Sequence, residues 1–293
     1  MSWQPNATTL IIDSPYLCYQ AFYTMGKLSH EDKATGVIYG FLMRLLALGE
    51  KFKTNDIVFG WDSKISLRKR KHDFYKSKRK ERNAEKAEEM STLYDQFDAL
   101  RIDLLPLMGF NNNYIFGGYE SDDIIGRIVQ DSVGRFVVVA GDEDLYQLLY
   151  NCRVYNPSKK ILLSAKGFTR EYGIDPHEWV RVKQIAGCTS DSVPGVPGVG
   201  EKTAIKYIRG ELASKLKTFK AIESEEGKEA IARNFWLVKL PLPTTPPIQK
   251  VSDHLSIDGF RQVCLANGFD SFLQEEKRWN DFFQGRFKDD EEA

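Results

Sequence analysis

Four short apolar runs in the first half of the chain each lead to an acidic residue. Short apolar runs without polar alternation are typical of strands buried on both faces of a sheet. The runs are Thr8–Ile12, Ile57–Trp61, Tyr114–Phe116 and Phe136–Ala140, and they lead to Asp13, Asp62, Glu120 and Asp142, respectively. Cys152–Asn156 and Ile161–Ser164 are typical of two short edge strands joined by a turn.

Segments with helical spacing lie between these runs. Apolar residues recur at helical spacing in Gly36–Leu48, and Gly49 marks the expected end of that helix. Ala84–Leu107 is amphipathic, and we expect its helix to be ended by Pro106 and Gly109. The alternation of strand and helix predicts an α/β fold with a mostly parallel central sheet and helices on both faces.

The pattern changes after about residue 170. Gln184–Ile208 is a turn-rich stretch with a helix predicted from about Glu201, and most of the remaining chain is helical apart from the loop Pro241–Ile248. We therefore expect an α/β domain over residues 1–170 and a helical region over residues 171–293.

The acids after the strands have a structural and a functional interpretation. A single Asp after a strand is most often a helix cap, and Ser121 is a candidate cap for a helix that begins with Asp122 and Asp123. Capping does not explain acids at the carboxyl ends of four strands, where open parallel sheets bind their ligands. Clustered carboxylates repel one another, and a divalent cation that prefers oxygen ligands, Mg²⁺ or Mn²⁺, relieves that repulsion. By strand alternation, Asp142 and Asp144 project to the same side.

Local charge is more informative than the total, because the formal net charge is zero. Residues 64–86 contain eleven Lys or Arg and three Asp or Glu. A solvated helical face is the ordinary interpretation, but Phe74 and Tyr75 lie among the cations, which favours a surface for the phosphates and bases of a nucleic acid. The glycine-rich turn between Asp191 and Lys202 also suits a phosphate oxygen.

Composition excludes other classes of protein. A hydrophobic content of 42% is ample for a packed core. No apolar run is long enough to span a membrane, and the four cysteines show neither zinc nor disulfide spacing. We expect a monomeric protein of the cytoplasm, without a membrane partner.

Six motifs in unbroken order over residues 8–210 resemble those of the 5′-nuclease family. These 5′-3′ exonucleases and flap endonucleases occur free-standing or as the N-terminal domain of some bacterial DNA polymerases. The motifs are LIID ending at Asp13, GVIYGF at 36–41, WD at Asp62 followed by R-x₆-YK-x₂-R from Arg68, GYESDDIIG at 118–126, GDEDLYQLL at 141–149 and SDSVPGVPGVGEKTA at 190–204. The resemblance implies a PIN-like nuclease domain with a helical arch at about 63–105, and a helix-three-turn-helix in the C-terminal region. No polymerase domain follows, so we expect the free-standing form, as in bacteriophages, where the host cytoplasm is the compartment, and some bacteria.

The resemblance also implies a site for two divalent cations, Mg²⁺ or Mn²⁺. Asp122 would lie between the two ions, with Asp123 close by. The carboxylates of the first ion would be Asp13, Asp62, Glu120 and Asp122, and those of the second ion Asp142, Asp144 and Asp191.

Further residues would contact the nucleic acid. At the base of the arch, Tyr75 would stack on a base, while Lys76 and Arg79 would contact the scissile phosphate. The other implied contacts are Arg68, Arg70, Lys78, Gly198, Gly200, Lys202 and Thr203, and a potassium ion would be held by the backbone of Ser192, Val193 and Val196.

The implied reaction is phosphodiester hydrolysis at DNA 5′ ends, flaps and RNA primers, with one ion activating water and the other stabilising the leaving oxygen. Activity on RNA–DNA hybrids (ribonuclease H activity) and a role in Okazaki fragment processing or repair belong to the same expectation. A replication protein, either a single-strand-binding protein or a clamp, is the partner considered at the C-terminus. Trp279–Phe283 is a candidate docking segment there, although core packing is favoured for it.

Two positions depart from the family pattern. Cys188 stands where a further carboxylate is usual, and Gln20 where an arginine is usual. Thiolate is a poor ligand for Mg²⁺, so we expect a weakened second site that needs more Mg²⁺ or favours Mn²⁺. The alternative hypothesis is a catalytically weakened homologue that mainly binds branched nucleic acid. A haloacid-dehalogenase-type phosphatase needs a second Asp where Ser14 and Pro15 follow Asp13, and a PIN-type ribonuclease explains neither arch nor hairpin.

Overall fold

The computed structural model describes residues 8–79 and 87–287. A six-stranded sheet in the order β5-β4-β1-β6-β7-β8 forms its centre, and every neighbouring pair is parallel except β7 and β8. The strands are β1 Thr8–Asp13, β4 Ile57–Gly60, β5 Asn113–Tyr114, β6 Arg135–Val139, β7 Cys152–Asn156 and β8 Ile161–Leu163. This arrangement confirms the predicted mostly parallel α/β fold, although β7 lies inside the sheet rather than at its edge.

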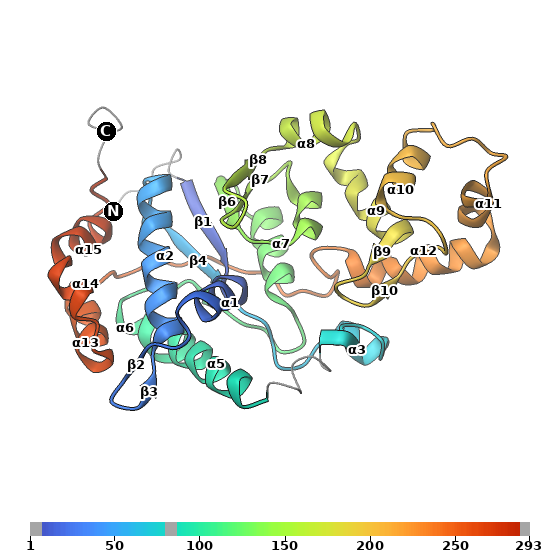
Figure 1. Cartoon of the computed structure of the whole chain (residues 1–293). Coiled ribbons are helices and arrows are strands. Elements are labelled where there is room, and N and C mark those ends of the chain that lie inside the picture. Colours follow the sequence, from blue (N-terminus) through green and yellow to red (C-terminus); the bar gives the residue numbers. More distant parts are fainter. Residues whose placement is uncertain (1–7, 80–86, 288–293) are drawn as a thin grey trace.

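Helices cover the sheet, and a mainly helical lobe extends from one side of it (Figure 1). The other elements in the first 150 residues are α1 Ser14–Met25, β2 Ser29–His30, β3 Lys33–Ala34, α2 Gly36–Phe52, α3 Leu67–Lys71, α5 Ala87–Ala99, a π-helical turn Leu100–Leu104, α6 Leu105–Leu107, α7 Ser121–Asp131 and a 3₁₀ helix Glu143–Leu148. The later elements are α8 Ala165–Tyr172, a 3₁₀ turn Pro176–Glu178, α9 Trp179–Ala186, β9 Gly187–Cys188, β10 Val193–Pro194, α10 Glu201–Ile208, α11 Lys217–Glu223, α12 Glu225–Val238, α13 Ile257–Asn267, α14 Asp270–Gln274 and α15 Glu276–Phe283.

Two hydrophobic cores lie on the two faces of the sheet. Successive residues of a strand point to opposite faces. Leu10 and Ile12 of β1 therefore pack in the core that contains α1 and α2, whereas Ile11 packs in the core that contains α7 and α9. Because both faces are covered, the central strands contain continuous apolar runs, which is why they stand out in the sequence.

The C-terminal helices α13, α14 and α15 return to the first core rather than joining the helical lobe (Figure 1). Trp279 is fully buried and stacks on Phe260, with ring centroids 4.4 Å apart. Phe282 lies so close to Gly49 that a Cβ there would be 2.2 Å from its ring. The core-packing interpretation of Trp279–Phe283 is thus confirmed, and α2 runs past Gly49 because this glycine makes room for Phe282 instead of ending the helix.

The boundaries of the other helices and strands agree with those predicted from the sequence to within a few residues, with some exceptions. Pro106 lies inside the short α6 rather than after the helix. Residues 80–86 of the predicted arch lie outside the described residues, and the domain boundary at residue 170 stays a prediction. Across the described ranges, no helix is long and apolar enough to cross a membrane.

Candidate functional site

Acidic side chains meet at the carboxyl ends of β1 and β4 and at the start of α7. Ser121 joins two of them, because its hydroxyl donates to Asp13 Oδ1 at 2.8 Å and its backbone N–H donates to Asp62 Oδ1 at 2.8 Å. Asp13 is the last residue of β1, and Asp62 follows β4. The parallel register of these strands therefore places both acids beside the N-terminus of α7.

Glu120 caps α7 and receives hydrogen bonds from the base of the predicted arch. The Tyr75 hydroxyl donates to Glu120 Oε2 at 2.9 Å, and Lys76 Nζ lies 2.8 Å from the same oxygen. Glu120 and Asp123 form a capping box. The helix cap is therefore Glu120, and the prediction that Ser121 caps α7 was wrong, since the Ser121 hydroxyl is bonded to Asp13 instead.

Asp191 meets the same basic segment from the other side. Arg79 Nη2 lies 3.2 Å and Lys76 Nζ 3.8 Å from the Asp191 carboxylate. The Lys76 backbone N–H also donates to the Asp191 carbonyl at 2.8 Å. Lys76 has a left-handed backbone conformation with a φ of 53°, which is uncommon for a residue other than glycine. Lys76 thus links Glu120 to Asp191.

Asp142 and Asp144 follow β6 as the sequence predicts. Asp142 caps the 3₁₀ helix by accepting from the Asp144 backbone N–H at 2.7 Å. Lys183 of α9 lies 3.2 Å from Asp144 and 2.7 Å from Glu201. Sequence reasoning missed Lys183, whose only signal is a lysine between the buried residues of an amphipathic helix.

The environment shifts the pKa of several of these acids. Burial and the neighbouring Asp62 raise the pKa of Asp13 to about 7, and burial and Asp142 raise that of Asp144 to about 7. Burial, Asp142 and Asp13 raise the pKa of Asp122 well above its usual value. Burial also acts to raise the pKa of Glu120, but Lys76 and Arg68 outweigh it and lower that pKa to about 2.

The donor set fits a divalent cation in its chemistry. The oxygen Asp122 Oδ1 is buried and has no hydrogen-bond partner, and the negative charges of Asp142 and Asp13 act on this residue. In the described part of the chain, however, no group of three His, Cys, Asp or Glu side chains is arranged to hold an ion. Instead, Lys76 pairs with Glu120 and Arg79 pairs with Asp191. An ion therefore has to displace these side chains before it can bind the two carboxylates.

Asp123 and Arg68 form a buried ion pair beside the acidic centre. Asp123 is fully buried and Arg68 is 2% exposed, and their bidentate pair has N–O distances of 2.5 and 2.8 Å. Arg68 also donates to the carbonyls of Leu237 and Lys239, both at 3.0 Å. Asp123 is therefore bound by an arginine in this structure, and the Arg68 side chain points into the protein. The predicted place of Asp123 at the metal site and the predicted contact of Arg68 with nucleic acid stay predictions.

Tyr75, for which stacking on a base is predicted, lies inside the protein in this structure. Its side chain is 3% exposed and packs in a small core with Val193, Leu237 and Val238. Phe74 is the more accessible ring, with the Arg233 guanidinium 5.7 Å from its centroid. Arg70 and Lys78 are exposed, as a role in nucleic-acid contact requires.

The predicted hairpin lies between α9 and α10. Strands β9 and β10 pair antiparallel, and Ser192 between them has a left-handed φ of 58°. A Cβ at Gly198 or Gly200 would meet no atom within 4 Å, so the backbone there faces open space. Lys202 on the next helix is exposed and Thr203 partly so, whereas the Val193 and Val196 side chains are buried.

Two residues of α12 that sequence reasoning missed hold this hairpin. The buried Asn234 amide donates to the carbonyls of Gln184 and Pro194, both at 2.9 Å. Arg233 donates to the same Pro194 carbonyl at 2.8 Å. Their signal in the sequence is weak, because polar residues on a helix are usually solvated.

The two residues that depart from the family pattern, Cys188 and Gln20, both have hydrogen-bond partners nearby. Cys188 Sγ lies 3.0 Å from the Ser190 hydroxyl, and burial and Asp144 raise the pKa of its thiol to about 11. Cys188 is therefore a neutral thiol at physiological pH. Gln20 donates to the Tyr16 and Ser158 hydroxyls, at 2.9 and 2.5 Å.

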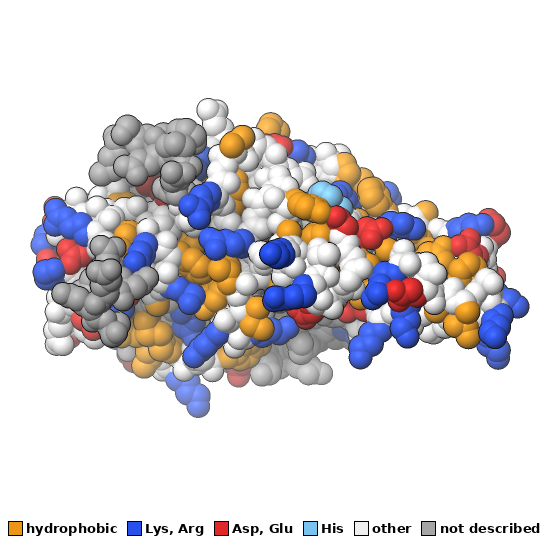
Figure 2. All heavy atoms as spheres, turned by 90° about the horizontal axis from the view of Figure 1, so that it is seen from above, with side chains coloured by type: hydrophobic (Ala, Val, Ile, Leu, Met, Phe, Trp, Pro, Cys, Tyr) orange, Lys and Arg blue, Asp and Glu red, His pale blue; other side chains and the backbone are white. Residues whose placement is uncertain are grey.

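The face on the amino-terminal side of the strands differs from the acidic centre. Seen from above, it carries basic and acidic side chains scattered among apolar ones (Figure 2). The acidic residues of the motifs lie at the carboxyl ends of the strands instead.

Comparison with known proteins assigns the chain to a family. Residues 8–173 match the N-terminal resolvase-like domain of the 5′-3′ exonucleases. DNA polymerase I of Bacillus caldotenax is 30% identical over 289 residues, which are 91% of this chain and 32% of the polymerase. DNA polymerase I of Bacillus subtilis (strain 168) is 30% identical over 230 residues, covering 75% of this chain and 25% of the polymerase. The chain thus belongs to the 5′-nuclease family, and it spans about a third or less of these relatives.

Solved structures share the fold at lower sequence identity. T5 5′-exonuclease, in a structure with bound zinc, superposes with a TM-score of 0.66 at 20% identity, covering 80% of this chain and 90% of that one. Flap endonuclease-1 from Methanococcus jannaschii superposes with a TM-score of 0.55 at 17% identity, covering 96% and 93%. At this identity the likeness supports the fold alone.

Proposed function

We propose that the chain is a metal-dependent 5′ nuclease that hydrolyses phosphodiesters at DNA 5′ ends and flaps and at RNA primers. The proposal depends on one observation, which is the environment of the Asp122 carboxylate. Burial and the nearby charges of Asp142 and Asp13 raise the pKa of this carboxyl group, and one buried oxygen has no hydrogen-bond partner. A carboxylate in that environment is stabilised by a cation on either side of it.

Two groups of acids would hold the cations around Asp122. Asp13, Asp62 and Glu120 belong to one group, and Asp142, Asp144 and Asp191 to the other. When bound, two such ions supply a hydroxide nucleophile at neutral pH and stabilise the leaving oxygen during in-line attack. The ions recorded with the T5 exonuclease support divalent metal dependence in this chain as well.

Lys76 and Arg79 have a second task in this proposal. In the structure they pair with Glu120 and Asp191. With Glu120 and Asp191 engaged by cations, the ammonium and guanidinium groups would be available to contact the phosphoryl oxygens of the scissile group. Lys183 keeps its contact with Asp144 and fixes the orientation of that carboxylate.

The hairpin between α9 and α10 would hold duplex DNA by its backbone. The open space at Gly198 and Gly200 lets phosphates approach the N–H groups before α10, and Lys202 is exposed beside them. One structural neighbour, a T5 flap endonuclease, is recorded in complex with DNA and metal ions, which supports the same substrate class here. Potassium at the hairpin, RNA–DNA hybrids as substrates, a replication or repair role and a protein partner remain parts of the proposal.

The decisive experiment compares the protein with its Asp122→Asn variant on a 5′-labelled flap in the presence of Mg²⁺. We expect cleavage near the junction by the unchanged protein and loss of cleavage in the variant, with flap binding retained. Asp131→Asn, at the other end of α7, is the matched control and should cleave normally. Equal cleavage by the protein and its Asp122→Asn variant would refute the site assignment.

The competing proposal is a weakened homologue that mainly binds branched nucleic acid, and the neutral thiol of Cys188 is the observation that favours it. The same assay separates the two proposals. A pure binding protein retains the flap but does not cleave it at any concentration of Mg²⁺ or Mn²⁺.

A further inference from the structure

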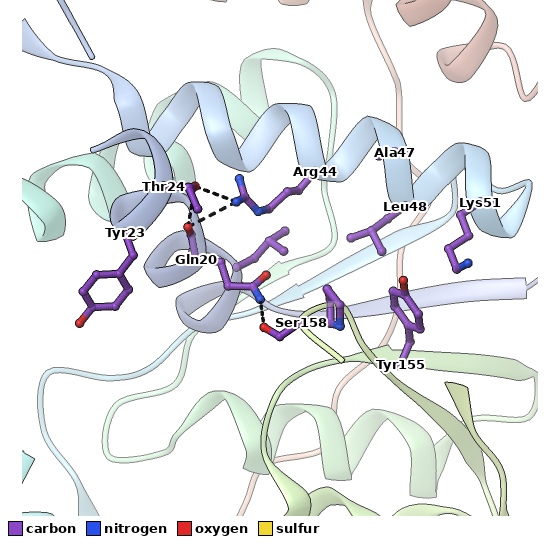
Figure 3. A pocket seen from close by; sticks show the side chains of 11 residues that line it. Gln20, Tyr23, Thr24, Arg44, Ala47, Leu48, Lys51, Tyr155 and Ser158 are labelled. Atoms are coloured by element: carbon purple, nitrogen blue, oxygen red, sulfur yellow. Dashed lines mark hydrogen bonds between the residues drawn. The ribbon is translucent and has the colours of Figure 1, made fainter. Parts of the chain in front are cut away.

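A pocket of about 530 Å³ lies outside the acidic centre, between α1, α2 and the turn after β7 (Figure 3). Its lining contains two cations, Arg44 and Lys51, and none of the described residues that line it is Asp or Glu. A pocket of this size accommodates a small organic ligand. Its positive charge selects an anion.

Arg44 has only neutral partners. Its guanidinium donates to the Gly40 carbonyl at 3.0 Å, to the Gln20 carbonyl at 3.4 Å and to the Thr24 hydroxyl at 2.8 Å. Among the ion pairs of the described residues, none includes Arg44 or Lys51. A partly buried guanidinium without an acidic neighbour retains a strong attraction for an anionic group.

The two ends of the pocket differ in polarity. The Gln20 amide and the Ser158 hydroxyl bond to each other beside Arg44, which makes this end polar (Figure 3). At the other end Lys51 Nζ lies 5.2 Å from the centroid of the Tyr155 ring, next to Leu48. Arg44 and Lys51 are two turns apart on α2, about 10 Å along the helix axis. An arginine with polar neighbours at one end, and the Tyr155 ring with Leu48 at the other, match a phosphate and a nucleobase at this separation.

We propose that this pocket binds one nucleoside monophosphate unit, with its phosphate against Arg44 and its base over Leu48 and Tyr155. The choice of a nucleotide over another anion rests on the proposed function. Tyr16 connects the pocket to the acidic centre, because its hydroxyl accepts from Gln20 and its ring lies against Gly141, next to Asp142. The unit is therefore either a free mononucleotide product or an unpaired nucleotide of a strand that passes the centre.

Calorimetric titration of the full chain with 2′-deoxyadenosine 5′-monophosphate in EDTA tests the proposal. Without divalent metal, the acidic centre repels the phosphate. We expect saturable binding that Arg44→Gln weakens at least about tenfold, as expected for the loss of a charge-assisted hydrogen bond. Ala47→Trp fills the pocket without changing its charge and should abolish binding. Lys277→Gln, an exposed site on α15, should leave it unchanged.

Three results would overturn the pocket assignment. They are no binding at millimolar nucleotide, unchanged binding in both Arg44→Gln and Ala47→Trp, and loss of binding in Asp122→Asn, which would place the nucleotide in the acidic centre. Lys51→Gln provides a second charge variant at an exposed position if Arg44→Gln fails to fold. Because no metal is present, failure here leaves the flap-cleavage result untouched.

A competition experiment identifies the source of the nucleotide. Flap DNA that displaces the mononucleotide places a strand in the pocket. Simultaneous binding of flap DNA and mononucleotide assigns the pocket to the free product. Either result supports the pocket, and deoxyadenosine, which lacks the phosphate, should bind more weakly in both cases.

Discussion

Replacing Arg68 by Met tests whether this arginine acts in folding or in nucleic-acid binding. Asp123 accepts both guanidinium hydrogen bonds of the pair and, in addition, bonds from the backbone N–H groups of Glu120 and Leu242. Arg68 in turn donates to carbonyls at residues 237 and 239. The pair thus joins α3, the start of α7 and the segment after α12.

The expected loss follows from burial. Without the guanidinium, the Asp123 carboxylate is left uncompensated in the interior, and removal of one partner of a buried pair typically destabilises a protein by about 3–5 kcal/mol. For a chain of this size each kcal/mol lowers the thermal midpoint by about 2 °C, so we expect a decrease of about 6–10 °C. The double variant Arg68→Met/Asp123→Leu should regain part of this loss, because it leaves no unpaired charge.

Thermal and urea unfolding monitored by circular dichroism measure the loss, and flap binding is measured on the same samples. Arg70→Met on the same helix is the matched control, since Arg70 is exposed, and its thermal midpoint should not change. An Arg68→Met protein with an unchanged midpoint and weakened flap binding would contradict this reasoning. It would restore the role in nucleic-acid contact that the sequence predicts.

Three further predictions concern the acids, the thiol and the C-terminal core. The pKa values of Asp13 and Asp144 rise from 3.8 to about 7 on folding, so their stabilising contribution is complete below about pH 4 and is lost as the pH rises through 7. The thermal unfolding midpoint of the metal-free protein should therefore fall between about pH 4 and pH 7, and Mg²⁺ should restore it. Asp144→Asn should make the midpoint depend less on pH. An equally steep pH dependence in this variant would refute the prediction. Cys188→Asp should lower the Mg²⁺ concentration needed for half-maximal cleavage. If that concentration does not change, the hypothesis of a weakened second site is wrong. Trp279→Ala should destabilise the protein by about 3–5 kcal/mol in urea unfolding, whereas a side chain used only for docking would leave stability unchanged.

The central sheet was predictable because its strands are covered on both faces. Burial on both faces favours continuous apolar runs in β1, β4 and β6, so these strands stand out in the sequence without any alignment. The acids after them were predictable for a related reason. Parallel strands end at one edge, so Asp13, Asp62 and Asp142 had to lie at the same edge of the sheet.

The roles of individual side chains were harder to predict, because a motif records neighbours in sequence and not burial. Arg68 and Tyr75 belong to the same basic motif as Arg70 and Lys78, yet the first two point into the protein and the latter two are exposed. The partners that bury Arg68 come from residues about 170 positions further along the chain. Lys183 was missed for the same reason, since its contact with Asp144 depends on the packing of α9 against the 3₁₀ helix.

The charge balance of the acidic centre indicates where a cation is needed most. Glu120 is compensated, because Lys76 and Arg68 lower its pKa to about 2 despite burial. Nearby cations do not compensate the charges of Asp13, Asp122 and Asp144 in the same way. Their pKa values are raised because burial and mutual repulsion exceed the effect of the available positive charge. A divalent cation therefore relieves the most repulsion when it binds near these three carboxylates. We therefore expect the first ion to bind around Asp122.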